Sequence, residues 1–157
     1  MKICVLGKPL SVNHAYVTTK QGRRFLSKEG VRYKQQIRAD VLLAAGFSAE
    51  SMREAARIAD PQSRLRVSYT FHLPDLLNSG WPKKAKSRYK RLDLSNLLKI
   101  LEDGLFEALG VDDSNVFEIL LKKEESEAAW TDIEVTVLEN DGRAEEAERN
   151  GAPRTVP

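Results

Sequence analysis

The segment Arg64–Leu73, RLRVSYTFHL, alternates polar and apolar residues along its whole length. Its apolar members are Leu65, Val67, Tyr69, Phe71 and Leu73. Because successive side chains of a β-strand point to opposite faces, this spacing predicts a strand with one buried and one open face. The buried face has to be covered, so the rest of the chain must supply amphipathic elements that pack on it.

The strongest helix signal is the segment Leu94–Leu109, which ends before Gly110. Its leucines recur at helical spacing, and we expect this stripe to face the core. The stripe consists of Leu94, Leu98, Leu101, Leu105 and Leu109. Gly110 suits the left-handed conformation that often ends a helix. Residues 28–46 follow Ser27, a suitable helix cap, with a weaker helical period, and residues 48–60 predict a second short helix before Pro61.

Further strands are predicted at Lys2–Leu6, Val116–Leu121 and Thr131–Leu138, and residues 20–23 suit the turn of a hairpin. Segments 7–13 and 75–90 are rich in loop-forming residues. This order of elements predicts an α+β fold, a small single domain with a mixed β-sheet packed by two main helices. We expect the domain to cover residues 1–139. The polar segment 140–157 has no apolar period and predicts a disordered tail.

The composition excludes several classes of protein. The single cysteine, Cys4, cannot form an internal disulfide, and no spacing of Cys and His predicts a zinc site. No apolar run reaches membrane-spanning length, and the N-terminal MKICVLG is too short for a signal peptide. We therefore expect a cytoplasmic protein with no membrane partner. The net charge of +2 does not by itself imply nucleic acid, so the placement of the charges matters more.

Positive charge is concentrated in the predicted loop before the long helix. Basic residues occupy six of the nine positions from 83 to 91: Lys83, Lys84, Lys86, Arg88, Lys90 and Arg91. Such a cluster can neutralise phosphates and make binding depend on salt, and Tyr89 can stack on an unpaired base. The alternative is a solvated, flexible loop, because charge runs often bind nothing specific.

Acidic residues lie at both ends of the long helix, with Asp93 before it and Asp112-Asp113 after it. If the strand after Asp113 runs back beside the strand that ends near Leu73, Asp113 comes close to Asp93. Mg²⁺ prefers carboxylate oxygens and needs only one or two of them beside a substrate phosphate. The metal polarises the phosphoryl oxygen and supplies a hydroxide, and a nearby Lys99 stabilises the developing charge. The pattern therefore favours metal-dependent phosphodiester hydrolysis.

Each of these residues also has a purely structural interpretation. Asp93 or Ser95 suits the cap of a helix, and Asp112-Asp113-Ser114 suits an ordinary turn. Lys99 and Asp103 have the i,i+4 spacing of a surface ion pair. The residue pattern leaves both interpretations open.

Taken together, these motifs resemble the RusA family of Holliday junction resolvases, endonucleases that cut four-way DNA junctions. PLSVNHAY (9–16), RRFLSKEGVRYK (23–34) and FHLPD (71–75) are similar to its Pro-rich opening, its second motif and the end of its next strand. DLSNLLK (93–99), followed by EDGLFEALGVDDSNV (102–116), resembles its signature of acids, Asn, Leu and Lys with a closing Asp-Asp. The resemblance runs from about Lys8 to about Leu138.

The resemblance implies a RusA-like domain that forms a homodimer, binds branched DNA and cuts two opposite strands using Mg²⁺, with Mn²⁺ as a substitute. A two-fold junction needs two matched active sites, which a C2 dimer supplies. The metal-binding acids map onto Asp93 and Asp113, and the catalytic lysine onto Lys99. We expect DNA contacts from Asn13 and from the basic loop. Because phages and prophages often carry such proteins, recombination, repair and DNA packaging are all open as host processes.

Ser95 departs from the family's pattern, which has a second acid at this position. A serine hydroxyl is a neutral and weaker Mg²⁺ ligand. Glu102 is one substitute, about 20° from Ser95 around the helix but about 10 Å along it, unless it is simply a solvent-facing residue. Asp112 is a second substitute.

Four functions follow from these alternatives. The first is an active junction resolvase, and the second is a branched-DNA-binding protein that cuts weakly because Ser95 removed a ligand. An enzyme acting on flaps or single strands, and a structural protein whose acids only cap and turn, also remain open.

Overall fold

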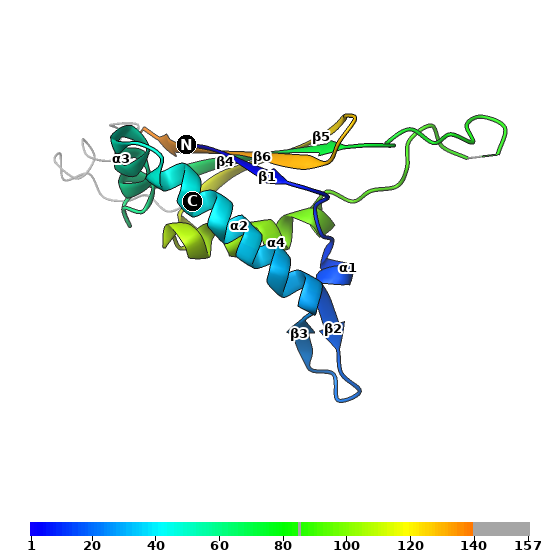
Figure 1. The fold of residues 1–157 in the computed structure, drawn as a ribbon, viewed down its shortest axis with the longest axis horizontal. Coiled ribbons are helices and arrows are strands. Elements are labelled where there is room, and N and C mark those ends of the chain that lie inside the picture. The colour runs from blue at the N-terminus through cyan, green and yellow to red at the C-terminus, as the bar shows by residue number, and fades with distance from the viewer. Residues whose placement is uncertain (85, 140–157) are drawn as a thin grey trace, which may run out of the picture.

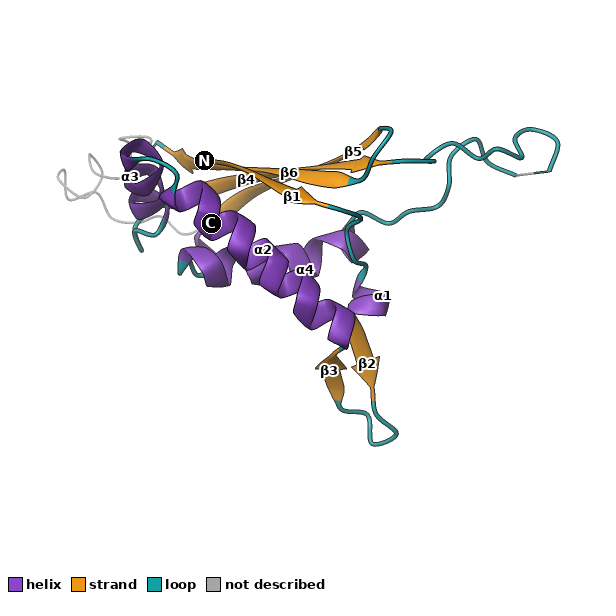
Figure 2. Ribbon diagram, viewed as in Figure 1, coloured by secondary structure: helices purple, strands orange, loops and turns teal. Residues whose placement is uncertain are grey.

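The computed structural model describes residues 1–84 and 86–139, which form a layer of β-sheet and a layer of helices (Figure 1). The strands of the main sheet are β1 (Lys2–Leu6), β4 (Arg64–Leu73), β5 (Val116–Glu125) and β6 (Trp130–Leu138). The remaining elements are α1 (Val12–Ala15), β2 (Tyr16–Thr18), β3 (Arg24–Leu26), α2 (Lys28–Gly46), α3 (Ala49–Ile58), α4 (Ser95–Leu109) and the 3₁₀ turn η1 (Asp113–Asn115). Figure 2 shows α1, α2 and α4 on one side of the sheet and α3 beside one end of it. The predicted α+β class, with a mixed sheet packed by two main helices, is confirmed.

The strand order of the sheet is β1-β6-β4-β5. Strand β4 pairs antiparallel with β6 and parallel with β5, and β6 pairs antiparallel with β1. In the parallel pair Leu65 lies beside Val116, and Phe71 lies beside Lys123. Two parallel strands need a crossover that returns the chain to the starting edge of the sheet. Here α4 makes that crossover, together with the long segment before it.

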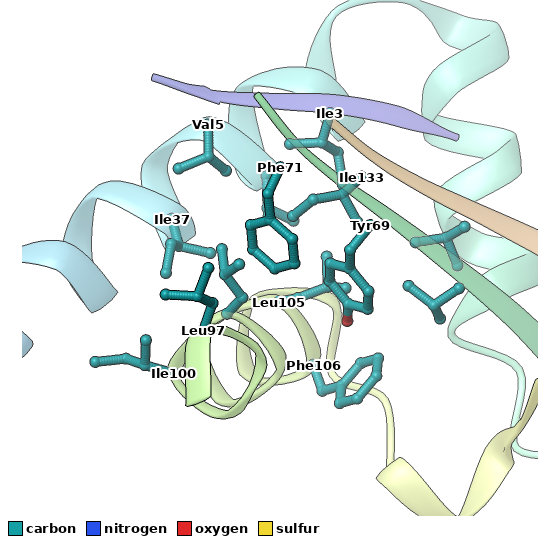
Figure 3. Packing of buried hydrophobic residues seen from close by; sticks show 14 of the residues in the cluster. Ile3, Val5, Ile37, Tyr69, Phe71, Leu97, Ile100, Leu105, Phe106 and Ile133 are labelled. Carbon is teal, nitrogen blue, oxygen red and sulfur yellow. The ribbon is translucent and has the colours of Figure 1, made fainter. Parts of the chain in front are cut away.

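The core lies between the sheet and the two long helices, α2 and α4. Tyr69 and Phe71 on β4 are fully buried, as the alternating pattern predicted. In Figure 3 both rings point toward α4, where Leu105 lies, and Phe71 also lies near Ile37 of α2. Fully burying one such side chain contributes about 1.5–3 kcal/mol, so this layer holds the two helices against the sheet.

The buried face of α4 is wider than the predicted stripe. Leu101 and Leu105 are fully buried, but Leu94, Leu98 and Leu109 only pack against the rim of the core. The other buried residues of this helix are Leu97, Ile100, Gly104 and Phe106. The difference arises because α4 packs against both the sheet and α2, so two of its sides are covered rather than one.

The predicted helix ends and hairpin are confirmed. The side chain of Ser27 accepts a hydrogen bond from the backbone N–H of Gly30 at 3.0 Å, which caps α2. Helix α4 ends at Gly110, whose φ of 67° is left-handed. Strands β2 and β3 pair antiparallel around the turn at residues 20–23.

Three segments differ from the predictions. The predicted loop 7–13 runs into the single helical turn α1, which is too short to show a helical period. Strand β5 continues past Leu121 to Glu125, because the charged residues that follow still pair with β4. The base of the predicted loop 75–90 is a short two-stranded ribbon, in which Leu77 pairs with Tyr89. The predicted tail, 140–157, lies outside the described residues.

No helix within the described ranges is long and apolar enough to cross a bilayer.

The contact between α4 and α2 provides a test of this packing. Gly104→Ala is expected to lower the free energy of unfolding by about 1–3 kcal/mol. The added Cβ would lie 2.9 Å from Cγ2 and 3.1 Å from Cβ of Ile37, a fully buried β-branched residue that cannot turn away. Urea denaturation measures the change.

Gly46→Ala is the matched control for this substitution. Gly46 also lies in a helix, but a Cβ added there meets nothing within 4 Å. Alanine at this position is therefore expected to leave the stability unchanged or to raise it. Equal effects of the two substitutions would contradict the close approach of the helices at Gly104.

Candidate active site

The start of α4 is organised by the carboxylate of Asp93. Its Oδ1 accepts hydrogen bonds from the backbone N–H of Ser95 at 3.1 Å and from the Ser95 hydroxyl at 2.8 Å. Its Oδ2 accepts one from the side-chain amide of Asn96 at 3.2 Å. The prediction that Asp93 or Ser95 is the cap of this helix is wrong in its position, because the cap is Leu94, which makes no side-chain capping hydrogen bond. The side chain of Asp93 still holds the first turn of α4 through these hydrogen bonds. The side chain is nevertheless exposed, so it can also face a ligand.

Ser95 acts here as a partner of Asp93. Its hydroxyl points at Asp93 and donates to it, so it adds no negative charge to the site. The position that the family's pattern fills with a second acid is thus neutral.

One turn further along α4, Lys99 donates a hydrogen bond to Oδ1 of Asp103 at 2.7 Å. This confirms the predicted i,i+4 pair. The second oxygen of Asp103 accepts a hydrogen bond from the hydroxyl of Tyr16 at 3.2 Å, and the Arg24 guanidinium lies 4.5 Å from the centre of the Tyr16 ring. The hydrogen bond with Asp103 raises the pKa of Lys99 above its usual value. Lys99 therefore stays a cationic donor at neutral pH and cannot serve as a base.

Glu102 lies on the same helix and is half-buried, so it is not a simple solvent-facing residue. Burial raises the pKa of its carboxyl; the positive charge of Lys99 opposes this shift, and the negative charges of Asp103 and Asp113 add to it. Glu102 therefore lies within electrostatic range of Asp113.

The residues after α4 form a turn at the other end of the helix. Oδ1 of Asp112 accepts a hydrogen bond from the backbone N–H of Ser114 at 2.9 Å. Hydrogen bonding by the Ser114 side chain, and after it by this backbone N–H, lowers the pKa of Asp112. Asn115 donates to the carbonyl of Pro61 at 3.4 Å, so this turn lies near the start of β4. The structural interpretation of Asp112-Asp113-Ser114 as a turn is confirmed.

The prediction that Asp113 comes close to Asp93 is wrong within one chain. It assumed that the strand after Asp113 begins beside the end of β4, whereas β5 is parallel to β4 and begins beside Leu65. The two acids are separated by α4, whose 15 residues span about 22 Å. Within the described ranges no three His, Cys, Asp or Glu residues are grouped so that they could hold a metal ion. Asp93 and Asp113 of a single chain therefore do not share one magnesium site.

A cleft of about 540 Å³ opens beside Asp93, at the start of α4. It is lined by Ser11, Asn13, Lys90, Arg91, Leu92, Asp93, Asn96, Leu97 and Lys123. Lys123 lies at the end of β5 and donates a hydrogen bond to the carbonyl of Leu92 at 3.1 Å, which ties the strand to the segment before α4. The cleft thus combines a carboxylate with several cationic and amide groups, a combination suited to a phosphate and its surroundings.

The segment between β4 and α4, which carries the predicted basic residues, extends away from the sheet and the helices (Figure 1). Lys83, Lys84, Lys86 and Arg88 are exposed, and none of them forms an ion pair with an acid in the described part of the chain. Tyr89 is 56% exposed, with the Arg88 guanidinium 5.7 Å from its ring centre. Lys90 and Arg91 alone, of the six predicted basic residues, line the cleft.

The β2–β3 hairpin forms a second basic projection, near the start of α2 in Figure 1. It carries Lys20, Arg23 and Arg24, all exposed. The hairpin was predicted, but its charge was not recognised as part of a binding surface. Its base joins the site directly, because Tyr16 on β2 binds Asp103, the partner of Lys99.

The comparison with protein families matches residues 7–137 to Endodeoxyribonuclease RusA. The chain belongs to the RusA family. No curated protein matches the chain. Membership of the RusA family implies nuclease activity of the Holliday junction resolvase type and binding of branched DNA.

The RusA match covers both ends of α4, so it includes Asp93, Lys99 and Asp113. Asn13, Lys90, Arg91 and Asp93 were predicted and lie together in the cleft. The three other polar lining residues, Ser11, Asn96 and Lys123, were missed, as were the apolar Leu92 and Leu97. Ser11 and Asn96 belong to the quoted motifs. Lys123 lies two residues after Leu121 on an alternating strand, so a longer strand prediction would have placed it on the same face.

The Lys99–Asp103 contact can be tested by titration. Asp103→Asn is expected to lower the pKa of Lys99 toward its ordinary value, because it removes both the charge and the best acceptor of the ammonium group. Carbon-detected NMR of the lysine side chains measures the pKa. Asp132→Asn, on the far side of the sheet, is the control and should leave Lys99 unchanged. An unaltered pKa in Asp103→Asn would mean that the ion pair does not persist in solution.

Proposed function

We propose that this RusA-family chain is a magnesium-dependent endonuclease that resolves four-way DNA junctions as a homodimer. The observation that carries the proposal is the cleft at the start of α4, where Asp93 lies among Asn13, Lys90 and Arg91. These cationic and amide groups bind the phosphates beside the scissile bond, and Lys99 donates to the negative charge that develops there. When bound, Mg²⁺ supplies the polarisation of the phosphoryl oxygen and a hydroxide.

Asp93 and Asp113 lie at opposite ends of α4, and this separation favours a metal site shared between the two chains of a dimer over a site within one chain. A two-fold axis can bring the end of α4 in one protomer to the start of α4 in the other, since a C2 interface joins two copies in opposite directions. Each site then takes Asp93 from one chain and Asp113 from the other. Two carboxylates suffice for Mg²⁺, which keeps several waters. Asp112 and Glu102, near Asp113, are the residues that compensate for Ser95 in such a site.

The second candidate function is a branched-DNA-binding protein with weak or no cleavage. The neutral Ser95, held by its hydrogen bond to Asp93, favours it. In that case the protein binds junctions but leaves them intact, and Ser95→Asp restores cutting. The cytoplasmic location, the host process and the use of Mn²⁺ stay predictions.

Cleavage of an end-labelled four-way junction with Mg²⁺, read on a denaturing gel, tests the proposal. The protein is expected to make paired symmetric cuts that are absent from linear duplex of the same sequence. Asp93→Asn and Asp113→Asn are each expected to abolish cutting while binding persists. Cleavage that survives Asp113→Asn would contradict the assigned role of that carboxylate.

A mixture of these two inactive variants distinguishes a shared site from two sites within single chains. In a mixed dimer, one site combines an intact Asp93 with an intact Asp113, and the other site lacks both. The mixture is therefore expected to regain nicking of one strand per junction. No recovery, in a mixture shown by mass to contain the mixed dimer, would place both acids of each site in one chain.

The basic loop is expected to contribute to binding through phosphates alone. Replacing Lys83, Lys84 and Lys86 with Ala should weaken junction binding and reduce the slope of log K against log salt by about 0.9 for each phosphate that is no longer neutralised. Fluorescence anisotropy at several salt concentrations measures the slope. Lys2→Ala, which removes an exposed lysine on β1, is the control; a slope equal to that of this control would exclude the loop from the interface.

A further inference from the structure

A further pocket, which we call the ribbon pocket, lies at the base of the two-stranded ribbon and has a volume of about 520 Å³. Its apolar lining comes from Leu76, Leu77 and Tyr89. Its charged lining comes from Arg88, Lys90, Lys123 and Glu125. A pocket of this size, with apolar walls and a few polar groups, has the usual form of a site for a small ligand.

The apolar wall of the ribbon pocket is fixed by the pairing of the ribbon. Two backbone hydrogen bonds flank the Leu77–Tyr89 pair. They join the N–H of Asn78 to the carbonyl of Arg88 at 2.8 Å and the N–H of Lys90 to the carbonyl of Leu76 at 2.9 Å. The pair is therefore of the non-hydrogen-bonded kind, in which opposite side chains of antiparallel strands lie closest together. Leu77 and Tyr89 consequently form one wall before any ligand arrives.

This wall is open to solvent. Tyr89 is 56% exposed and Leu77 is 47% exposed, whereas Leu76 is buried. An open aromatic ring is a surface on which an unpaired base can stack, because every base has a flat π-face. The Arg88 guanidinium lies 5.7 Å from the centre of the Tyr89 ring, so positive charge accompanies the stacking surface.

The ribbon pocket adjoins the cleft at the start of α4, because Lys90 and Lys123 line both of them. The cleft offers cationic and amide groups to a phosphate, and the ribbon pocket offers an apolar wall. A nucleotide carries both of the matching parts, a charged phosphate and a flat base that are joined by one sugar. The two neighbouring sites therefore suit a nucleotide of the DNA better than a purely apolar ligand.

One acid interrupts the positive charge of this surface. Glu125, the last residue of β5, is exposed, and it forms no ion pair with any residue of the described ranges 1–84 and 86–139. An ionised carboxylate only accepts hydrogen bonds, and its charge repels phosphate. Its place in the lining therefore calls for a hydrogen-bond donor on the base. Adenine, cytosine and guanine carry an exocyclic amino group that donates, and thymine carries none.

We propose that the ribbon pocket holds one unpaired base of the branched DNA, stacked on Tyr89 and Leu77, with its exocyclic amino group donating to Glu125. Lys90 and Lys123, at the border with the cleft, bind the phosphate of the same nucleotide. The proposal deepens the proposed function and rests on it for the DNA that the cleft holds. It makes the affinity for a junction depend on the base beside the bound phosphate, with thymine the least favoured.

Binding to four-way junctions with one unpaired nucleotide at the branch point tests the stacking. Fluorescence anisotropy without divalent ions measures the dissociation constant while no strand is cut. Tyr89→Ala is expected to weaken binding roughly tenfold when the unpaired nucleotide is adenine. The same variant is expected to bind like the unsubstituted protein when that nucleotide lacks its base.

Tyr89→Phe is the matched control, because it keeps the ring and removes only the hydroxyl. It is expected to bind both junctions like the unsubstituted protein, and circular dichroism shows whether each variant is folded. An equal loss of affinity on the two junctions in folded Tyr89→Ala would overturn the proposal, since the effect would not then depend on the base.

The comparison of cytosine with thymine tests the role of Glu125, because the two rings are of equal size. The unsubstituted protein is expected to bind the junction with unpaired cytosine roughly tenfold more tightly than the one with unpaired thymine. Glu125→Gln is expected to remove this preference, since an amide also donates and can serve the carbonyl oxygens of thymine.

Glu127→Gln is the control for the change of charge. Glu127 is exposed two residues further along and does not line the ribbon pocket, so this variant should keep the preference for cytosine. Equal binding of the two junctions by the unsubstituted protein, or a preference that survives Glu125→Gln, would overturn the assigned contact with the amino group.

These results separate the ribbon pocket from the activity, because binding is measured without cleavage. A protein that cuts junctions but shows no dependence on the unpaired base would overturn the pocket alone. A protein that shows both dependences but cuts no junction when Mg²⁺ is added would overturn the proposed function alone.

Discussion

The parallel pairing of β4 with β5 is the constraint on which the arrangement of this site depends. Two parallel strands start at the same edge, so the chain must travel the length of the sheet between them. The returning element is α4, which is buried against both the sheet and α2. Residues just before α4 and just after it are consequently held at opposite ends of this helix. The direction of β5 relative to β4, and not separation in sequence, therefore decides which side chains share a site.

The secondary structure was largely predictable, because the spacing of apolar residues along the chain shows which side of each element is buried. The alternation on β4 and the helical spacing on α4 both follow from one apolar face packed on a common core. The direction of β5 was not predictable in the same way. A strand alternates whether its neighbour runs parallel or antiparallel, so the pattern carried no information on which end of β4 lies near Asp113. The misplacement of that residue relative to Asp93 follows from this ambiguity.

The residues of the cleft were predictable in part for a similar reason. Asn13 and Asp93 belong to motifs with a recognisable order, and Arg91 belongs to the basic cluster. Lys123 comes from a distant strand whose charged end was not predicted to be part of it. The link from Tyr16 through Asp103 to Lys99 joins segments far apart in sequence, and only the fold brings the hairpin to that side of α4. Asp103 accepts hydrogen bonds from Lys99 on α4 and from Tyr16 on β2, so its carboxylate is held from two elements and in turn orients Lys99.

The carboxylate of Asp93 could serve both the helix and a metal ion only through the same two oxygens. It accepts three hydrogen bonds that hold the first turn of α4, two on Oδ1 and one on Oδ2. A divalent ion that bound here would either use the remaining lone pair of Oδ2 or displace one of these donors. In the second case the free energy of loosening the first turn would be subtracted from the affinity for the ion, and ion binding would be thermodynamically linked to fraying of the helix.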